Sequence, residues 1–121
     1  MIRLHPKLQD LFKIVDERLL CPFCKMSMKN LDPYFYHCNC RNGTGIKYEF
    51  NGERSGFNAF SFSFKMNRGR IWVSAWLPTE TTSLTFVKKG IQTTIKVPTT
   101  DFPWLDLQQM REKVSTLFIF A

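Results

Sequence analysis

The chain has 121 residues, a length at which one domain with a single core is expected. Hydrophobic residues make up 44% of it and aromatic residues 15%, which excludes a disordered chain. The formal net charge of +7 favours attraction to nucleic acid or to acidic proteins. The chain has neither a membrane-length apolar run nor an N-terminal signal peptide, so we expect a cytoplasmic protein without a membrane partner.

Residues 6–19 are predicted to form a helix. Pro6 suits the first helical position, where its missing N–H costs nothing. The apolar residues that follow have the spacing of one helical face: Leu8, Leu11, Phe12, Val15 and Leu19. A helix that packs on the core is favoured over an amphipathic helix that binds a partner. Since it leads directly into Cys21, we expect it to brace the cysteine cluster.

All four cysteines fall within twenty residues, as the pair Cys21 and Cys24 and the pair Cys38 and Cys40. Two tight turns that each supply two thiolates meet the tetrahedral preference of Zn²⁺. In a reducing compartment a metal site is favoured over disulfides or free thiols. Four protein thiolates leave no open position for substrate, so the predicted Zn²⁺ is structural. His37 is an alternative ligand, although neighbouring strand residues point to opposite faces.

The stretch 21–40 resembles a zinc ribbon, a metal-bound hairpin found in many nucleic-acid-handling and interaction proteins. The resemblance rests on the two cysteine pairs and on the segment between them. Residues 25–29 and 34–38 are the predicted strands of this hairpin, and residues 30–33 its turn. Residues 41–45 are expected to leave the hairpin as a loop.

Residues 46–97 are predicted to form an antiparallel sheet of about five strands, at 46–50, 60–66, 70–77, 82–88 and 91–97. Turns are expected at Asn51-Gly52 and Lys89-Gly90. One face of the second strand carries only apolar side chains, from Phe60, Phe62, Phe64 and Met66. Trp72 and Trp76 lie opposite the aliphatic face of the third strand. Both a sheet covered on its two faces and an exposed aromatic surface fit this pattern.

A helix is predicted at residues 103–116, with Asp101 as its N-cap. One side of it would carry Trp104, Leu107, Arg111, Val114 and Phe118. Residues 117–120 fit a helix or a strand equally well. The predicted fold is thus a single α+β domain: N-terminal helix, zinc ribbon, antiparallel sheet and C-terminal helix. The ribbon hairpin either stands apart or continues the sheet.

The positive charge is concentrated between Lys25 and Arg70, a segment that contains eight lysines and arginines but only three aspartates and glutamates. Aromatic residues are interleaved with them, as in proteins that bind phosphates with cations and stack bases on rings. The candidate residues for binding nucleic acid or a protein partner are Lys25, Lys29, Tyr34, Tyr36, Arg41, Lys47, Arg68, Arg70, Trp72 and Trp76. A solvated basic face and rings buried in a covered sheet would explain the same residues.

Three classes of function fit the sequence. The favoured one is a non-enzymatic zinc-binding module that engages nucleic acid or nucleic-acid machinery. A second is a small adaptor or inhibitor of a larger complex, since this compact chain without motifs resembles bacteriophage-encoded accessory proteins in style. The third is an enzyme whose site is assembled from distant residues. No catalytic motif is present, so neither an enzyme nor a small-molecule substrate is expected.

Overall fold

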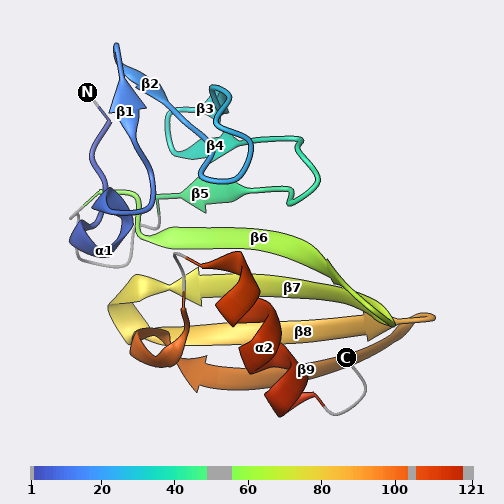
Figure 1. Ribbon diagram of the computed structural model, residues 1–121. Coiled ribbons are helices and arrows are strands. Elements are labelled where there is room, and N and C mark those ends of the chain that lie inside the picture. The colour runs from blue at the N-terminus through green and yellow to red at the C-terminus, as the bar shows by residue number, and fades with distance from the viewer. Residues whose placement is uncertain (1, 49–55, 104–105, 119–121) are drawn as a thin grey trace.

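The centre of the fold is one antiparallel sheet in which strands adjacent in sequence are also adjacent in space (Figure 1). This computed structural model describes residues 2–48, 56–103 and 106–118. The strands of the sheet are β3 (Lys29–Asp32), β4 (Phe35–His37), β5 (Gly45–Lys47), β6 (Ala59–Met66), β7 (Gly69–Trp76), β8 (Thr81–Lys88) and β9 (Ile91–Pro98). The prediction of a mixed fold with a large antiparallel sheet and a C-terminal helix is confirmed. In the described residues this sheet has seven strands instead of about five, because the hairpin β3–β4 joins β5 and continues the sheet.

The four long strands β6 to β9 form three successive hairpins, and their sequences alternate between apolar and polar residues. The predicted apolar face of β6 is buried throughout, and Ile71 and Val73 of β7 lie on the same side. Lys89 and Gly90 form the predicted two-residue turn, each with a positive φ, and place Lys88 opposite Ile91. β5 ends at Lys47, earlier than predicted, and the expected turn at Asn51-Gly52 lies outside the described residues.

The C-terminal helix α2 (Leu107–Leu117) packs across one face of the sheet (Figure 1). Asp101 is not its N-cap, because the chain is extended at Phe102 after a short 3-10 turn (Thr99–Asp101). Asp106 caps the helix instead, and its Oδ1 accepts a hydrogen bond of 3.1 Å from the Gln109 N–H. The helix buries Met110, Val114 and, just after its end, Phe118, whereas Arg111 is exposed. The predicted position of Trp104 lies outside the described residues.

The predicted helix at 6–19 is wrong beyond its first turn. Helix α1 covers Pro6–Gln9 and is followed by a small hairpin of β1 (Ile14–Val15) and β2 (Arg18–Leu19). Asp16 and Glu17 both have positive φ and form the two-residue turn that pairs Val15 with Arg18. The apolar spacing is satisfied without a helix, since Leu8, Phe12 and Leu19 are buried while Val15 is 45% exposed.

The ribbon hairpin is shifted from its predicted position. Its first strand is Lys29–Asp32, so the residues predicted as a turn are mostly strand. Lys25 has a positive φ and belongs to a turn, which prevents a strand from starting there. Asp32 Oδ1 accepts a hydrogen bond of 2.7 Å from the Tyr34 N–H, which moves the reversal of the chain to residues 32–34.

A close backbone contact at Gly56 joins the N-terminus to the sheet. Gly56 has a φ of 110°, and a Cβ there would lie 2.5 Å from the carbonyl oxygen of Arg3. We therefore expect Gly56→Ala to destabilise the fold by about 2–4 kcal/mol in a denaturant titration. Gly90→Ala is the control, because Gly90 also has a positive φ but has no atom within 4 Å of the added Cβ. Equal losses in the two variants would contradict the role of the contact.

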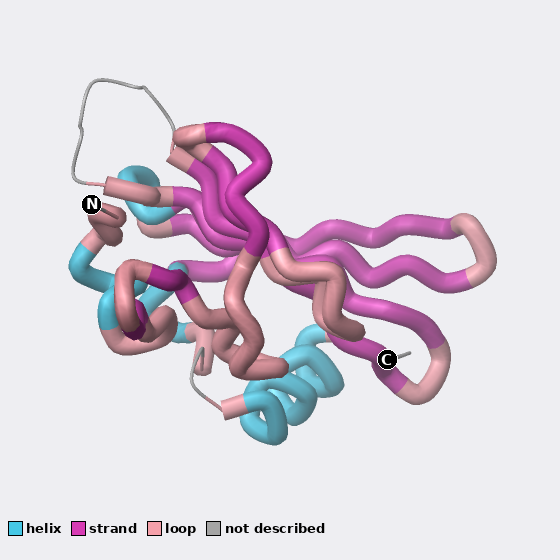
Figure 2. Tube along the Cα trace, turned by 90° about the horizontal axis from the view of Figure 1, so that it is seen from above, coloured by secondary structure: helices cyan, strands magenta, loops and turns pink. Residues whose placement is uncertain are grey.

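The sheet has one face covered by α2 and one open face. On the covered side, Phe86 lies 5.8 Å from Phe118, and Phe12 lies 5.1 Å from Phe60 between ring centroids. No described helix lies over the other side, and Figure 2 shows α2 along only one side of the strands. Trp72, which points away from the core, is 50% exposed. We call this side, with its side chains from β3 to β9, the open face.

Candidate metal centre

Two tight turns carry the four cysteines. In the first, the Lys25 N–H donates to the Cys21 carbonyl over 3.0 Å, and the positive φ of Lys25 reverses the chain after Cys24. In the second, the Gly43 N–H donates to the Cys40 carbonyl over 3.0 Å. Both turns are anchored to the covered side of the sheet. Phe23, between the first two cysteines, packs 5.0 Å from Phe62, and Cys38 directly follows β4.

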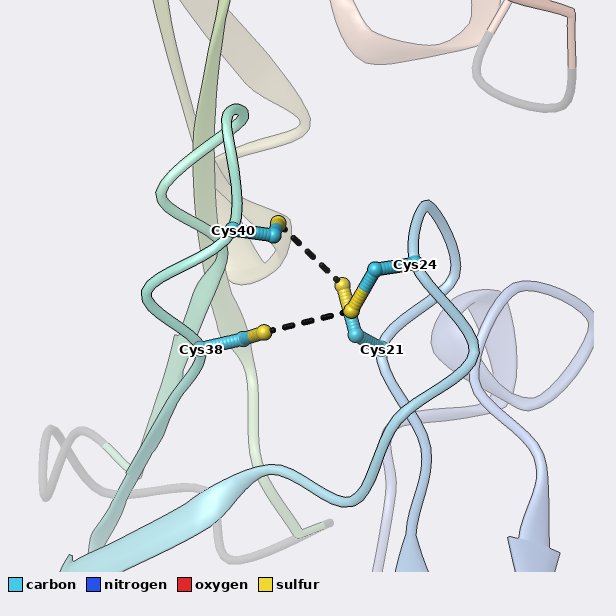
Figure 3. Close-up of side chains that lie close together, drawn as sticks. All are labelled: Cys21, Cys24, Cys38 and Cys40. Atoms are coloured by element: carbon cyan, nitrogen blue, oxygen red, sulfur yellow. Dashed lines mark hydrogen bonds between the residues drawn. The ribbon is translucent and has the colours of Figure 1, made fainter.

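The four Sγ atoms form a compact group, all within 4.8 Å of one another. Figure 3 shows Cys21 and Cys24 facing Cys38 and Cys40, with separations of 3.7 Å between Cys21 and Cys40 and 3.4 Å between Cys24 and Cys38. A metal–sulfur bond of about 2.3 Å in a tetrahedron requires sulfurs about 3.8 Å apart. A disulfide requires about 2.0 Å, and all four cysteines are free. The cluster therefore fits a four-coordinate metal ion, as predicted.

The surroundings of the sulfurs also suit a cation. Burial raises the pKa of Cys21, and burial is also the main cause that raises the pKa of Cys38 to about 12. Burial acts in the same direction on Cys40, but hydrogen bonds from the Asn42 backbone and from neighbouring thiols outweigh it and lower the pKa of Cys40 to about 7. Several adjacent thiolates repel one another, so a bound divalent cation is what allows all four to ionise.

We expect Zn²⁺ binding at pH 7.5 to release protons from at least Cys21 and Cys38. Their raised pKa keeps both thiols protonated without metal, whereas metal-bound thiolates are deprotonated. Affinity should therefore rise with pH, by about two log units per pH unit from these two thiols. Calorimetry in two buffers of different ionisation enthalpy measures the number of protons. Binding without proton release would contradict this description of the cluster.

His37 is not part of the cluster. It pairs with Lys29 and Gly45 in the sheet, and so its side chain lies on the open face while Cys38 turns toward the other cysteines. Its Nδ1 is buried and has no hydrogen-bond partner among the described residues. In those residues, the four cysteines are the one group of three or more ligating side chains close enough to share a metal.

The structure distributes the predicted binding residues over several surfaces. Strand register places five of them on the open face: Lys29, Lys47, Arg70, Trp72 and Trp76. Tyr36 is on the covered side, where its ring lies 5.3 Å from Phe57. Lys25 is exposed in the first cysteine turn, Tyr34 follows β3, Arg41 follows Cys40, and Arg68 is in the β6–β7 turn.

Five further residues lie with the predicted ones and were missed from the sequence. Phe35, His37, Lys65 and Lys96 are on the open face, and Arg111 of α2 faces a cleft that Arg70 also lines. Strand alternation could have identified Lys96, because Gln92, Thr94 and Lys96 occupy every second position of β9 and so lie on one face. Arg111 gave no such signal, because it was assigned to the apolar side of the helix.

Comparisons with known proteins do not supply a family or a fold relative. The chain matches no protein-family model, no curated protein and no solved structure. None of the described helices has the length and apolar character needed to cross a membrane. Arguments about function therefore rest on the chain's own residues.

Proposed function

We propose that this protein is a non-enzymatic module that holds a structural Zn²⁺ and binds single-stranded nucleic acid on the open face of its sheet. The observation that carries the proposal is the charge of the sheet. The six strands β4 to β9 contain no aspartate or glutamate, and Asp32 of β3 is the one carboxylate in the seven strands. Within these strands a phosphate backbone on this face would meet one carboxylate, that of Asp32, which pairs with Phe35 of β4.

The cations are distributed over the whole width of the open face. Strand pairing aligns Lys29 with His37 and Gly45, and this row continues through serines of β6, β7 and β8 to Lys96 on β9. Lys47 belongs to the next row, which also contains Trp76. Adjacent strands are about 4.8 Å apart, so these rows run across the twisted sheet with cations at both edges. Such spacing suits several phosphates of an extended strand.

Aromatic side chains lie between these cations. Trp72 is exposed, and the Arg70 guanidinium lies 6.0 Å from the centre of its ring. Trp76 and Phe35 occupy the row that contains Lys47. An exposed indole on a sheet is a stacking platform for a base, here on the ring face that the Arg70 guanidinium does not cover.

Two unsatisfied polar atoms give a further reason to place a ligand here. Among the described residues, the buried side-chain nitrogens without a hydrogen-bond partner are His37 Nδ1 and Trp76 Nε1. Both side chains belong to the open face. Buried polar groups in folded proteins are normally paired, so these two nitrogens need a partner such as solvent or a bound ligand.

The metal has a structural role in this proposal. Zn²⁺ suits four thiolates in a tetrahedron, and the two cysteine turns sit on the covered side of the sheet, away from the proposed ligand. Cys38 directly follows His37 in the chain, so the metal fixes the end of β4 without contacting the bound strand. The ion thus stabilises β4, and with it this part of the open face, from the covered side of the sheet.

The salt dependence of binding tests the proposal. Affinity for a labelled single-stranded oligonucleotide should fall with a slope of about −0.7 per phosphate contact in log–log form, or roughly −2 to −3.5 for three to five contacts. Fluorescence anisotropy from 50 mM to 400 mM salt would measure it. No binding to single-stranded DNA or RNA at the lowest salt would refute the proposal.

A protein partner is the second candidate, and exposed apolar residues near the metal favour it. Met26, two residues after Cys24, is 68% exposed, and Leu31 in the following strand β3 is 59% exposed. An adaptor or inhibitor of a larger complex would use such residues as contacts. Affinity capture with and without nuclease distinguishes the two functions. A stoichiometric protein that survives nuclease and is lost with Met26→Ser would favour the adaptor.

A further inference from the structure

A basic cleft of about 590 Å³ lies between α2, β6 and the loop that follows Cys40. Four of its six lining residues are cations and none is a carboxylate: Arg41, Asn42, Lys65, Arg70, Leu107 and Arg111. These residues come from three separate parts of the chain: the loop after Cys40, the β6–β7 hairpin and α2. The cleft was therefore not recognisable from any single motif.

The cleft forms because β5 is short. β5 pairs with β6 only as far as Ser61, and from there the loop after Cys40 takes its place beside β6. The Ser63 N–H donates to the Asn42 carbonyl over 2.6 Å, and the Asn42 side-chain amide donates to the Ser63 carbonyl over 2.9 Å. These bonds hold Arg41 beside β6, at a place fixed by the metal-binding loop.

Arg70 is held in position by uncharged groups. Its Nε donates to Ser63 Oγ over 2.9 Å, and its terminal nitrogen donates to the Arg41 carbonyl. Ser63 is buried although it is polar, which fits its role as an acceptor for Arg70. A guanidinium that is oriented without a carboxylate keeps its full charge for an external anion.

The other cations of the cleft also lack a counter-charge. Within the described residues, Arg41, Lys65 and Arg111 have no ion pair with a carboxylate. The nearest acidic side chain in the neighbouring hollow is Glu112, which hydrogen-bonds to Gln108. Four like charges gathered around one concavity repel one another, and a bound anion relieves that repulsion.

We propose that this cleft binds the dianionic phosphate group of a phosphate monoester. A monoester carries close to two negative charges and three terminal oxygens at neutral pH, which suits four convergent cations better than a singly charged phosphodiester does. The monoester is either the terminal phosphate of a nucleic-acid strand, which rests on the function proposed above, or a free phosphorylated compound. Arg70 links the cleft to Trp72, so a terminal phosphate here would place the following base near the indole.

Phosphate binding is tested first without nucleic acid. Inorganic phosphate titrated into the metal-loaded full chain at low salt should shift the NMR signals of the Arg70 Nε–H and of the Asn42 and Ser63 amides. Lys65→Gln combined with Arg111→Gln should weaken this binding at least tenfold. Lys13→Gln combined with Lys113→Gln is the charge-matched control, because each of these lysines lines a different hollow. No saturable shift, or equal loss in the control, overturns the proposal.

Oligonucleotides then identify the source of the phosphate. Strands of one sequence carrying a 5′-phosphate, a 3′-phosphate or only hydroxyl ends are compared with wild type and the double variant. Tighter binding of one phosphorylated end, lost in the double variant, assigns the cleft to a strand terminus. Saturable binding of inorganic phosphate without any oligonucleotide binding supports the cleft, assigns it to a free phosphorylated compound, and refutes the nucleic-acid function alone.

Discussion

Removal of the metal ion is expected to abolish the folded structure of the N-terminal third of the chain. The segment from Leu19 to Asp32 forms only short strands, and it joins the core through buried Leu19, Cys21 and Met28 and through the ring pair of Phe23 and Phe62. Structural zinc contributes about 10–16 kcal/mol in small domains, comparable to the total stability of about 5–15 kcal/mol of a folded protein. We therefore expect the melting temperature to fall by more than about 10 °C.

Thermal melts followed by circular dichroism, with and without a strong chelator, measure this effect. NMR spectra should lose the dispersed amide signals of residues 19–47 first, while the long strands β6 to β9 keep more of theirs. Cys24→Ser should reproduce the loss without chelator. Met26→Ser is the matched control, since Met26 is in the same turn but is mostly exposed. An unchanged melting curve after complete metal removal would refute a structural role for the ion.

The long strands and the cysteine cluster were predictable because their signals are local. Alternation alone determined the buried face of β6, and the Lys89-Gly90 turn set the register of β8 and β9. The cysteine spacing brought four thiols together whatever the details of the hairpin between them. In each case a pattern of a few neighbouring residues defined the structure.

The errors occurred where one pattern satisfied two structures. Leu8 and Phe12 have helical spacing, but the positive φ of Asp16 and Glu17 turns the chain into a hairpin in which Leu19 is still buried. Two acidic residues in succession carry no strong turn signal, so the sequence contained no indication that the helix ends before Asp16. At the C-terminal helix, two aspartates could serve as caps, and the extended backbone at Phe102 excludes Asp101.

The candidate binding surface required tertiary information. Whether Trp72 is covered depends on which side of the sheet α2 occupies, and periodicity of the helix does not specify this. The sequence marked Arg41 and Arg70 as basic but did not bring them together. Their contact exists because β5 stops short and the loop after Cys40 pairs with Ser63.

The sheet separates the metal from the open face, although both depend on the same strand β4. The cysteine turns lie on its covered side, and β4 carries Phe35 and His37 of the open face immediately before Cys38. The loop after Cys40 likewise contributes Arg41 to the basic cleft. Loss of the metal should therefore weaken ligand binding indirectly, by releasing β4 and this loop, and the fold of β6 to β9 would remain the better preserved part.

Replacement of Trp72 by alanine is expected to weaken binding of a single-stranded oligonucleotide by about 5–150-fold. Stacking of one base on an aromatic ring contributes about 1–3 kcal/mol, and each 1.4 kcal/mol changes affinity tenfold. Trp72→Phe should retain part of the affinity. Because no charge is removed, the salt slope should stay unchanged in both variants, whereas Lys96→Gln should reduce it by about 0.7 with a smaller loss at low salt.

Anisotropy titrations at several salt concentrations separate these effects. Ile91→Ala is the control for loss of an exposed apolar side chain, since Ile91 is 71% exposed and lies on the opposite side of β9 from Lys96. It should leave the affinity unchanged. If Trp72→Ala binds as tightly as wild type while its melting curve is intact, the indole is not a stacking platform. Nucleic acid would then have to contact another face, and the basic open face would be only a solvated surface.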